Sequence, residues 1–129
     1  MQEVIDQSDI LIFAIPSAHL DDVIQNQQVA GMENKLLISA IKGMVVKYDS
    51  IPARYLHKEF QVPYDRIGLI AGPCHAEEVA REKLSYLTVA CPDLTIAQAV
   101  ASALKTRYIR VSTSEDVFGT EIAAVLKNI

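Results

Sequence analysis

The chain has 129 residues, half of them hydrophobic, which is enough for one domain with an apolar core and too few for two. Its formal net charge is −4 and it has no long block of like charges, which argues against nucleic acid as a partner. The acidic N-terminus lacks a signal-peptide pattern, no apolar stretch is long enough to span a bilayer, and the two cysteines and three histidines have no metal-site spacing. We therefore expect a cytoplasmic protein without a metal site.

Short apolar runs alternate with helical patterns along the chain. The first run, residues 10–15, is continuously apolar and predicts a strand covered on both faces. Pro16 ends it, and Ser17 is a candidate cap for a helix that carries Leu20, Val23 and Ile24 on one face. The later strands are expected at residues 36–41, 67–71, 85–90 and 108–111, and the later helices at about 52–60, from about 74, at about 95–104 and from about 116.

The last predicted helix has an apolar stripe of Phe118, Ile122, Val125 and Ile129. Strands that alternate with helices at this spacing predict βαβ units, and therefore an α/β fold with a Rossmann-like, mostly parallel sheet. The five glycines form no G-x-G-x-x-G motif, which normally binds a cofactor pyrophosphate. The chain also begins just before a predicted strand and ends inside a predicted helix. We therefore expect residues 1–129 to form an incomplete Rossmann-like domain.

Three predicted strands end in residues suited to binding. They are followed by Pro16 and Ser17, by Lys42 and Gly43, and by Gly72, Pro73 and Cys74. Ligands of open parallel sheets bind beyond the carboxyl ends of the strands, so these segments would share one crevice if the strands are neighbours. Lys42 would be the cation of that crevice, and a helix that opens at Pro73 would present free backbone N–H groups. Taken singly, each feature is more often a solvated loop residue or a turn.

Four stretches of the chain carry recognisable motifs: SDILIFAIPSAHL, LISAIKG, IGLIAGPCHAEEVAREK and EDVFGTEIAAVLKNI. The second ends in a Lys-Gly pair, the third resembles a Gly-Pro-(Ser/Thr)-x-Ala-x-Glu segment, and the last resembles a helix ending in Leu-Lys-Asn. Taken together and in this order, the four stretches resemble the glycerol-3-phosphate dehydrogenase family over almost the entire chain.

The resemblance implies reversible hydride transfer between NAD or NADP and a phosphorylated small molecule, which interconverts glycerone phosphate and sn-glycerol 3-phosphate. It implies that Lys127 is the proton acceptor and donor and that Lys42 contacts both cofactor and substrate. A cation and a proton donor are what a ketone needs as negative charge develops on its oxygen. The other implied contacts are Gly72, Cys74 and Asn128 for the substrate, and Pro16, Ser17 and Ala76 for the cofactor.

The sequence departs from the family pattern in two ways. Position 74 is a cysteine where the family prefers serine or threonine, and a thiol is a weak donor, so we expect this contact to use a backbone N–H. The family's first βαβ unit and its C-terminal helical domain have no counterpart here, so the isolated chain should be a poor enzyme. The alternatives are a 6-phosphogluconate-like β-hydroxyacid dehydrogenase and a non-catalytic binding or assembly module. The choice between NAD and NADP is left open, as is a homodimer.

Overall fold

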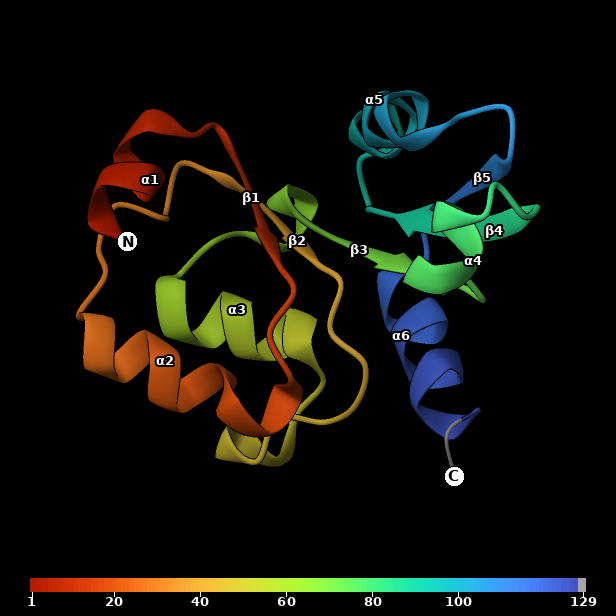
Figure 1. Ribbon diagram of the computed structural model, residues 1–129. Helices are drawn as coiled ribbons and strands as arrows, with labels where there is room; N and C mark the ends of the chain where they lie inside the picture. The colour runs from red at the N-terminus through yellow and green to blue at the C-terminus, as the bar shows by residue number, and fades with distance from the viewer. Residues whose placement is uncertain (128–129) are drawn as a thin grey trace.

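The computed structural model describes residues 1–127, which form a five-stranded sheet with helices on both of its faces (Figure 1). The strands are β1 (Ile10–Phe13), β2 (Leu36–Ser39), β3 (Ile67–Ala71), β4 (Ser85–Ala90) and β5 (Ile109–Ser114). The α-helices of the described residues are α1 (Gln2–Gln7), α2 (Leu20–Gln27), α3 (Pro52–Phe60), α4 (Ala76–Ala80), α5 (Leu94–Leu104) and α6 (Val117–Leu126). Short 3₁₀ turns lie at Ser17–His19, Lys47–Asp49 and Tyr64–Arg66. No helix in this part of the chain is long and apolar enough to cross a membrane.

The strands lie in the order β1-β2-β3-β4-β5. The first three are parallel to one another, β4 runs antiparallel to β3, and β5 is parallel to β4. The predicted α/β fold with a mostly parallel sheet is therefore confirmed. In Figure 1, α2 and α3 lie against the first three strands, α5 lies over β4 and β5, and α6 runs beside β3.

The direction of the sheet reverses between β3 and β4. A parallel crossover usually runs through a full helix, whereas residues 72–84, which join β3 to β4, contain only the five-residue α4. This connection brings the chain back antiparallel to β3. As a result, the carboxyl ends of β1, β2 and β3 share one edge of the sheet, and those of β4 and β5 lie at the opposite edge.

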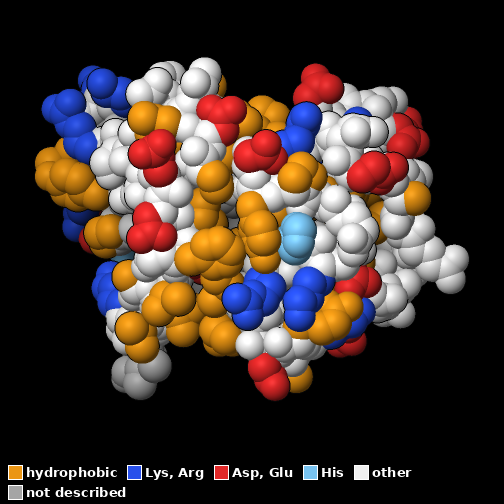
Figure 2. Space-filling model, turned by 180° about the vertical axis from the view of Figure 1, so that it is seen from behind, with side chains coloured by type: hydrophobic (Ala, Val, Ile, Leu, Met, Phe, Trp, Pro, Cys, Tyr) orange, Lys and Arg blue, Asp and Glu red, His pale blue; other side chains and the backbone are white. Residues whose placement is uncertain are grey.

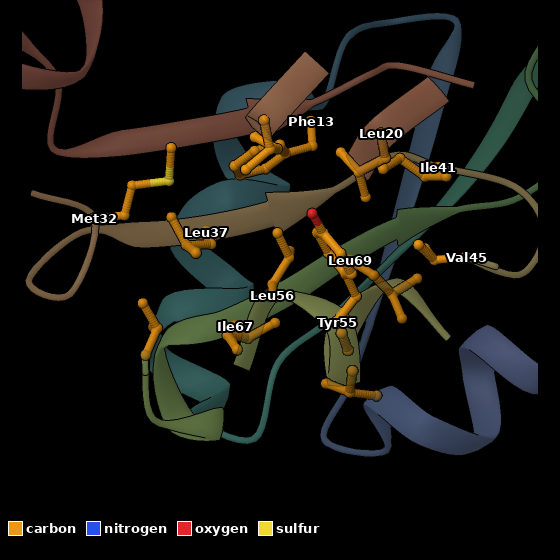
Figure 3. Close-up of a cluster of buried hydrophobic side chains, with 14 of the residues drawn as sticks. Phe13, Leu20, Met32, Leu37, Ile41, Val45, Tyr55, Leu56, Ile67 and Leu69 are labelled. Atoms are coloured by element: carbon orange, nitrogen blue, oxygen red, sulfur yellow. The ribbon is translucent and has the colours of Figure 1, made fainter. Parts of the chain in front are cut away.

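Successive side chains of the strands point to opposite faces of the sheet and pack into two apolar clusters, one on each face. On β3, Leu69 belongs to the larger cluster and the next residue, Ile70, packs against the smaller one under α5. Figure 3 shows the larger cluster, in which side chains from β1, β2 and β3 meet those of α2 and α3. Tyr55 and Leu56 of α3 are fully buried there. This packing fixes the strands whose ends carry the candidate site.

The prediction that the first strand is covered on both faces is wrong. Leu11 and Phe13 pack against the larger cluster, but Ile10 and Ile12 are 49% and 55% exposed. The reason is that β1 lies at the end of the sheet, where Ile10 and Ile12 line an open hollow together with Met1 and Val4, which are themselves exposed. A continuously apolar run predicted the strand, but it could not show which neighbours the strand has.

Two helix starts also differ from the predictions. Ser17 makes no capping hydrogen bond, because a 3₁₀ turn at Ser17–His19 comes first and α2 begins only at Leu20. Helix α1 was not predicted, since it buries only Ile5 and its first residue offers no side-chain cap.

The predicted apolar stripe of the last helix is only partly buried: Phe118 and Val125 are half-buried and Ile122 is exposed. The buried residues of α6 are Val117 and Glu121, while Ile122 is 47% exposed and Leu126 is 60% exposed. Ile129 lies outside the described residues. Ile122 and Leu126 line a hollow together with Met44. Figure 2 shows apolar side chains that gather on the back face of the molecule. The most deeply buried residues of α6 are therefore Val117 and a carboxylate, that of Glu121, and not the members of the apolar stripe.

Candidate active site

One pocket lies at the edge of the sheet where β2 and β3 end. Lys42, Gly72 and Lys127 all line it, although they are far apart in the sequence. Its volume of about 250 Å³ suits a small metabolite better than a whole dinucleotide, since pockets for drug-sized ligands run to roughly 300–1,000 Å³. The other lining residues are Ile41, Leu69, Ile70, Ala71, Pro73, Thr88, Thr120, Glu121, Ala123 and Ala124.

The loops after β1 and β2 lie side by side next to this pocket. Gly43 has a φ of +108°, and a Cβ added to it would lie 3.0 Å from Oγ of Ser17. Pro16 and Ser17 are not part of the pocket lining. Because β1, β2 and β3 are parallel neighbours, Pro16, Lys42 and Gly72 lie at the same edge, as the sequence predicted.

The segment after β2 is held in place by a polar cluster between α2 and α3. Nζ of Lys47 lies 3.1 Å from a carboxylate oxygen of Asp21 and 3.0 Å from one of Glu59. The hydroxyl of Tyr55 donates a hydrogen bond to Asp21 at 2.8 Å. The hydrogen bonds to Glu59 and Asp21, together with the two negative charges, raise the pKa of Lys47, so its ammonium stays charged. These contacts tie the chain downstream of Lys42 to two helices.

The loop after β3 depends on a glycine at position 72. Gly72 has a φ of +133°, and an added Cβ would lie only 2.5 Å from the backbone oxygen of Tyr86. Its own carbonyl accepts a hydrogen bond from the N–H of Cys74 at 3.0 Å. This N–H is thus already engaged within the loop, contrary to the expectation that it would be the donor to a substrate.

The helix expected to open at Pro73 begins later. Its first residue is Ala76, and α4 is only five residues long. Cys74 and Ala76 therefore follow the pocket in sequence without lining it. The predicted row of free N–H groups at Pro73 is wrong, because Gly72 to His75 form an irregular turn instead of the first turn of a helix.

Helix α6 brings Lys127 to the pocket from the C-terminal side. Asp116 caps the helix, since its side chain accepts a hydrogen bond from the N–H of Gly119 at 2.8 Å. Phe118 meets the ring of Tyr64 edge-on, with ring centroids 5.2 Å apart. Lys127 follows the last turn and is exposed. Asn128, the other predicted residue of the Lys-Asn pair, lies outside the described residues.

Lys42 and Lys127 are both available to a ligand. Neither takes part in an ion pair within residues 1–127, where the three ion pairs involve Lys47 and Arg107. Two amines facing one small pocket suit an anionic molecule on which further negative charge develops during a reaction.

Glu121 lines the same pocket, and no role was predicted for it. Its side chain is only 3% exposed, and Oε2 accepts a hydrogen bond from the N–H of Ala53 at 3.2 Å. Burial raises the pKa of Glu121 to about 7, although the hydrogen bond from Ala53 opposes the shift. The signal that could have indicated it is a carboxylate among the apolar residues of the last predicted helix.

One known protein family matches most of the chain. A family model described as "NAD-dependent glycerol-3-phosphate dehydrogenase N-terminus" matches residues 1–97. The chain belongs to the NAD-dependent glycerol-3-phosphate dehydrogenase family. The resemblance carried by the four sequence stretches is thereby confirmed.

Curated glycerol-3-phosphate dehydrogenases match the whole chain. The enzyme from Pseudomonas syringae is 36% identical over 126 residues, which are 98% of this chain and 36% of that protein. The enzyme from Alcanivorax borkumensis is 31% identical over 129 residues, which are all of this chain and 37% of that protein. The chain thus spans little more than a third of the length of these glycerol-3-phosphate dehydrogenases.

A solved structure has the same fold. Glycerol-3-phosphate dehydrogenase from Plasmodium falciparum superposes with a TM-score of 0.87 at 24% identity, over 99% of this chain and 36% of that one. The five-stranded sheet described above is therefore a part of the Rossmann-like fold of this dehydrogenase.

Proposed function

We propose that the complete gene product interconverts glycerone phosphate and sn-glycerol 3-phosphate by hydride transfer with NAD or NADP, and that this chain supplies one wall of its active site. The observation that carries the proposal is the meeting of Lys42, Gly72 and Lys127 in one pocket at the carboxyl edge of β2 and β3. The names of the curated relatives support the choice of reaction and cofactor.

In the proposed reaction, a residue of this chain transfers the proton to and from the substrate oxygen. When the ketone is reduced, Nζ of Lys127 donates a proton to the carbonyl oxygen as negative charge develops on it, and in the reverse direction the neutral amine removes that proton from the hydroxyl. Lys42 lines the same pocket and stabilises the anionic oxygen and the substrate's negative charge. Gly72, Cys74 and Asn128 are the other proposed substrate contacts.

The cofactor would lie along the neighbouring loops. Gly43, next to Lys42, lies close to Ser17, so the loops that follow β1 and β2 would meet the nicotinamide end of the molecule together. Pro16, Ser17, Lys42 and Ala76 are the proposed contacts. Nicotinamide, when bound, supplies or accepts the hydride. The sequence has no G-x-G-x-x-G turn for the pyrophosphate, so these residues would hold only part of the cofactor.

The chain is proposed to be a partial nucleotide-binding domain whose last helix, α6, leads toward a C-terminal domain. The share of the curated relatives that it spans supports this. Both cysteines are free thiols, which suits the proposed location in the cytoplasm. A homodimer is left open.

The proposed reaction is tested by presenting the complete gene product with different substrates. We expect oxidation of NADH or NADPH that depends on glycerone phosphate, with formation of sn-glycerol 3-phosphate. Unphosphorylated glycerone is the matched control and should react far more slowly, because it lacks the negative charge that the two lysines attract. Reduction of NADP with 6-phosphogluconate as substrate would favour a 6-phosphogluconate-like dehydrogenase instead. If the folded protein transferred no hydride with any of these substrates, a non-catalytic binding or assembly module would be favoured.

A further inference from the structure

Helix α6 is anchored by few residues. Its buried side chains are Val117 in the first turn and Glu121 in the second, and the residues after Glu121 are all at least partly exposed as far as Lys127. At a rise of 1.5 Å per residue, Glu121 precedes Lys127 by roughly 9 Å along the helix axis. Glu121 is thus the last buried anchor of the helix before the proposed catalytic lysine.

The anchor is a hydrogen bond between two helices. Helix α3 begins with Pro52, and Ile51 before it offers no side-chain cap. The next N–H, that of Ala53, has no partner within its own helix and donates instead to Oε2 of Glu121, 68 positions further along the chain. The positive end of the α3 dipole also favours a carboxylate at this place. Glu121 therefore caps α3 from α6.

The carboxyl is chemically unusual for a packing residue. It is 3% exposed, and its second oxygen, Oε1, has no hydrogen-bond partner among residues 1–127. An unpaired polar atom in the interior is destabilising, so a residue needed only to fill this space would be apolar. Lys42 from the end of β2 and Lys127 from α6 line the pocket with it, but neither forms an ion pair with it. Helix α3 adds the exposed Arg54, and β3 contributes no charged residue.

We propose that Glu121 is a positioning residue, whose hydrogen bond to Ala53 fixes α6 against α3 and thereby holds Lys127 at the pocket wall beside Lys42 and Gly72. The inference rests on the proposed function, since it assumes that Lys127 is the proton carrier. Glu121 itself transfers no proton to the substrate. Its ionised form accepts the stronger bond from Ala53, so the position of α6 depends on its protonation.

NMR spectroscopy of the 129-residue chain tests the positioning. In a titration from pH 5 to pH 9, the amide signals of Ala53 and Lys127 should shift together, with a midpoint near the pKa of Glu121, about 7. Glu121→Gln keeps an oxygen for Ala53 and should abolish this shift while leaving both signals near one end of the wild-type range. Glu77→Gln, in the exposed first turn of α4, is the matched control and should leave the titration unchanged. If the amide signal of Ala53 shifted with pH and that of Lys127 did not, the proposal would be overturned.

Steady-state kinetics of the complete gene product are the second test of the positioning role of Glu121. Glu121→Leu removes the oxygen, and since misplacing a catalytic group by about 1 Å can cost up to roughly 100-fold, we expect kcat to fall by about 10- to 100-fold with little change in the KM for cofactor. Glu121→Gln should retain most of the activity. Equal losses in both variants would contradict a positioning role. If Lys127→Met stayed active while the NMR coupling was present, the proposed role of Lys127 as proton carrier would fail and the link between α3 and α6 would stand.

Discussion

Lys127→Met in the complete gene product is expected to lower kcat for glycerone phosphate reduction by about 10²–10⁴-fold, the usual contribution of general acid–base catalysis. The variant loses the proton donor and the positive charge that faces the developing alkoxide. Methionine is unbranched and has good helix propensity, so the end of α6 should keep its structure. Cofactor affinity should stay nearly unchanged. Steady-state kinetics with saturating cofactor, together with a direct binding titration, measure both quantities.

Lys42→Met is the comparison that separates the two lysines. Lys42 lines the same pocket, but it follows β2 and lies beside the loop proposed to meet the cofactor. Its loss should therefore weaken the binding of both ligands as well as turnover. Near wild-type turnover of Lys127→Met would show that Lys127 is a surface lysine and that the proton carrier is another group.

Gly72→Ala is expected to destabilise the fold and to disturb the pocket. The φ of +133° is one that residues with a side chain rarely adopt, and the new Cβ would lie 2.5 Å from the Tyr86 oxygen, so backbone must move. Strain of this kind costs about 1–3 kcal/mol and overpacking a similar amount, so we expect the free energy of unfolding to fall by about 2–6 kcal/mol. Urea denaturation of the 129-residue chain measures it.

Gly31→Ala is the matched control for this substitution. Gly31 also has a positive φ, +80°, but an added Cβ there would meet nothing within 4 Å. Its cost should be limited to backbone strain, about 1–2 kcal/mol. If the two variants lost the same stability, the close approach of Gly72 to β4 would have no energetic importance.

Local sequence signals predicted much of the fold. The strands Ile67–Ala71 and Ser85–Ala90 and the helix Pro52–Phe60 match the predicted bounds, because each is an apolar or amphipathic run bounded by turn residues. The exposed face of β1 and the reversal at β4 were not predicted. Both depend on which elements become neighbours, and the composition of a single segment does not contain that information.

The candidate site also combines residues that local sequence signals predicted with a contact that depends on which elements become neighbours. Lys42, Gly72 and Lys127 were predicted from strand ends and from motifs, and the structure brings all three to one pocket. The contact of Glu121 with Ala53 joins residues 68 positions apart, and it exists only because α6 buries its carboxylate and leaves Ile122 exposed. The apolar stripe predicted from helical periodicity included the half-buried Phe118 and Val125, but it did not indicate that Glu121 would be the buried residue of this face.

A crystal structure of the complete gene product with NAD and glycerone phosphate tests the central claim most directly. The account predicts the ketone oxygen within hydrogen-bonding distance of Nζ of Lys127, about 2.7–3.2 Å, with Lys42 beside the substrate and the nicotinamide along the loops that follow β1 and β2. Substrate bound away from the carboxyl edge of β2 and β3, or a Lys127 that points away from it, would contradict the account.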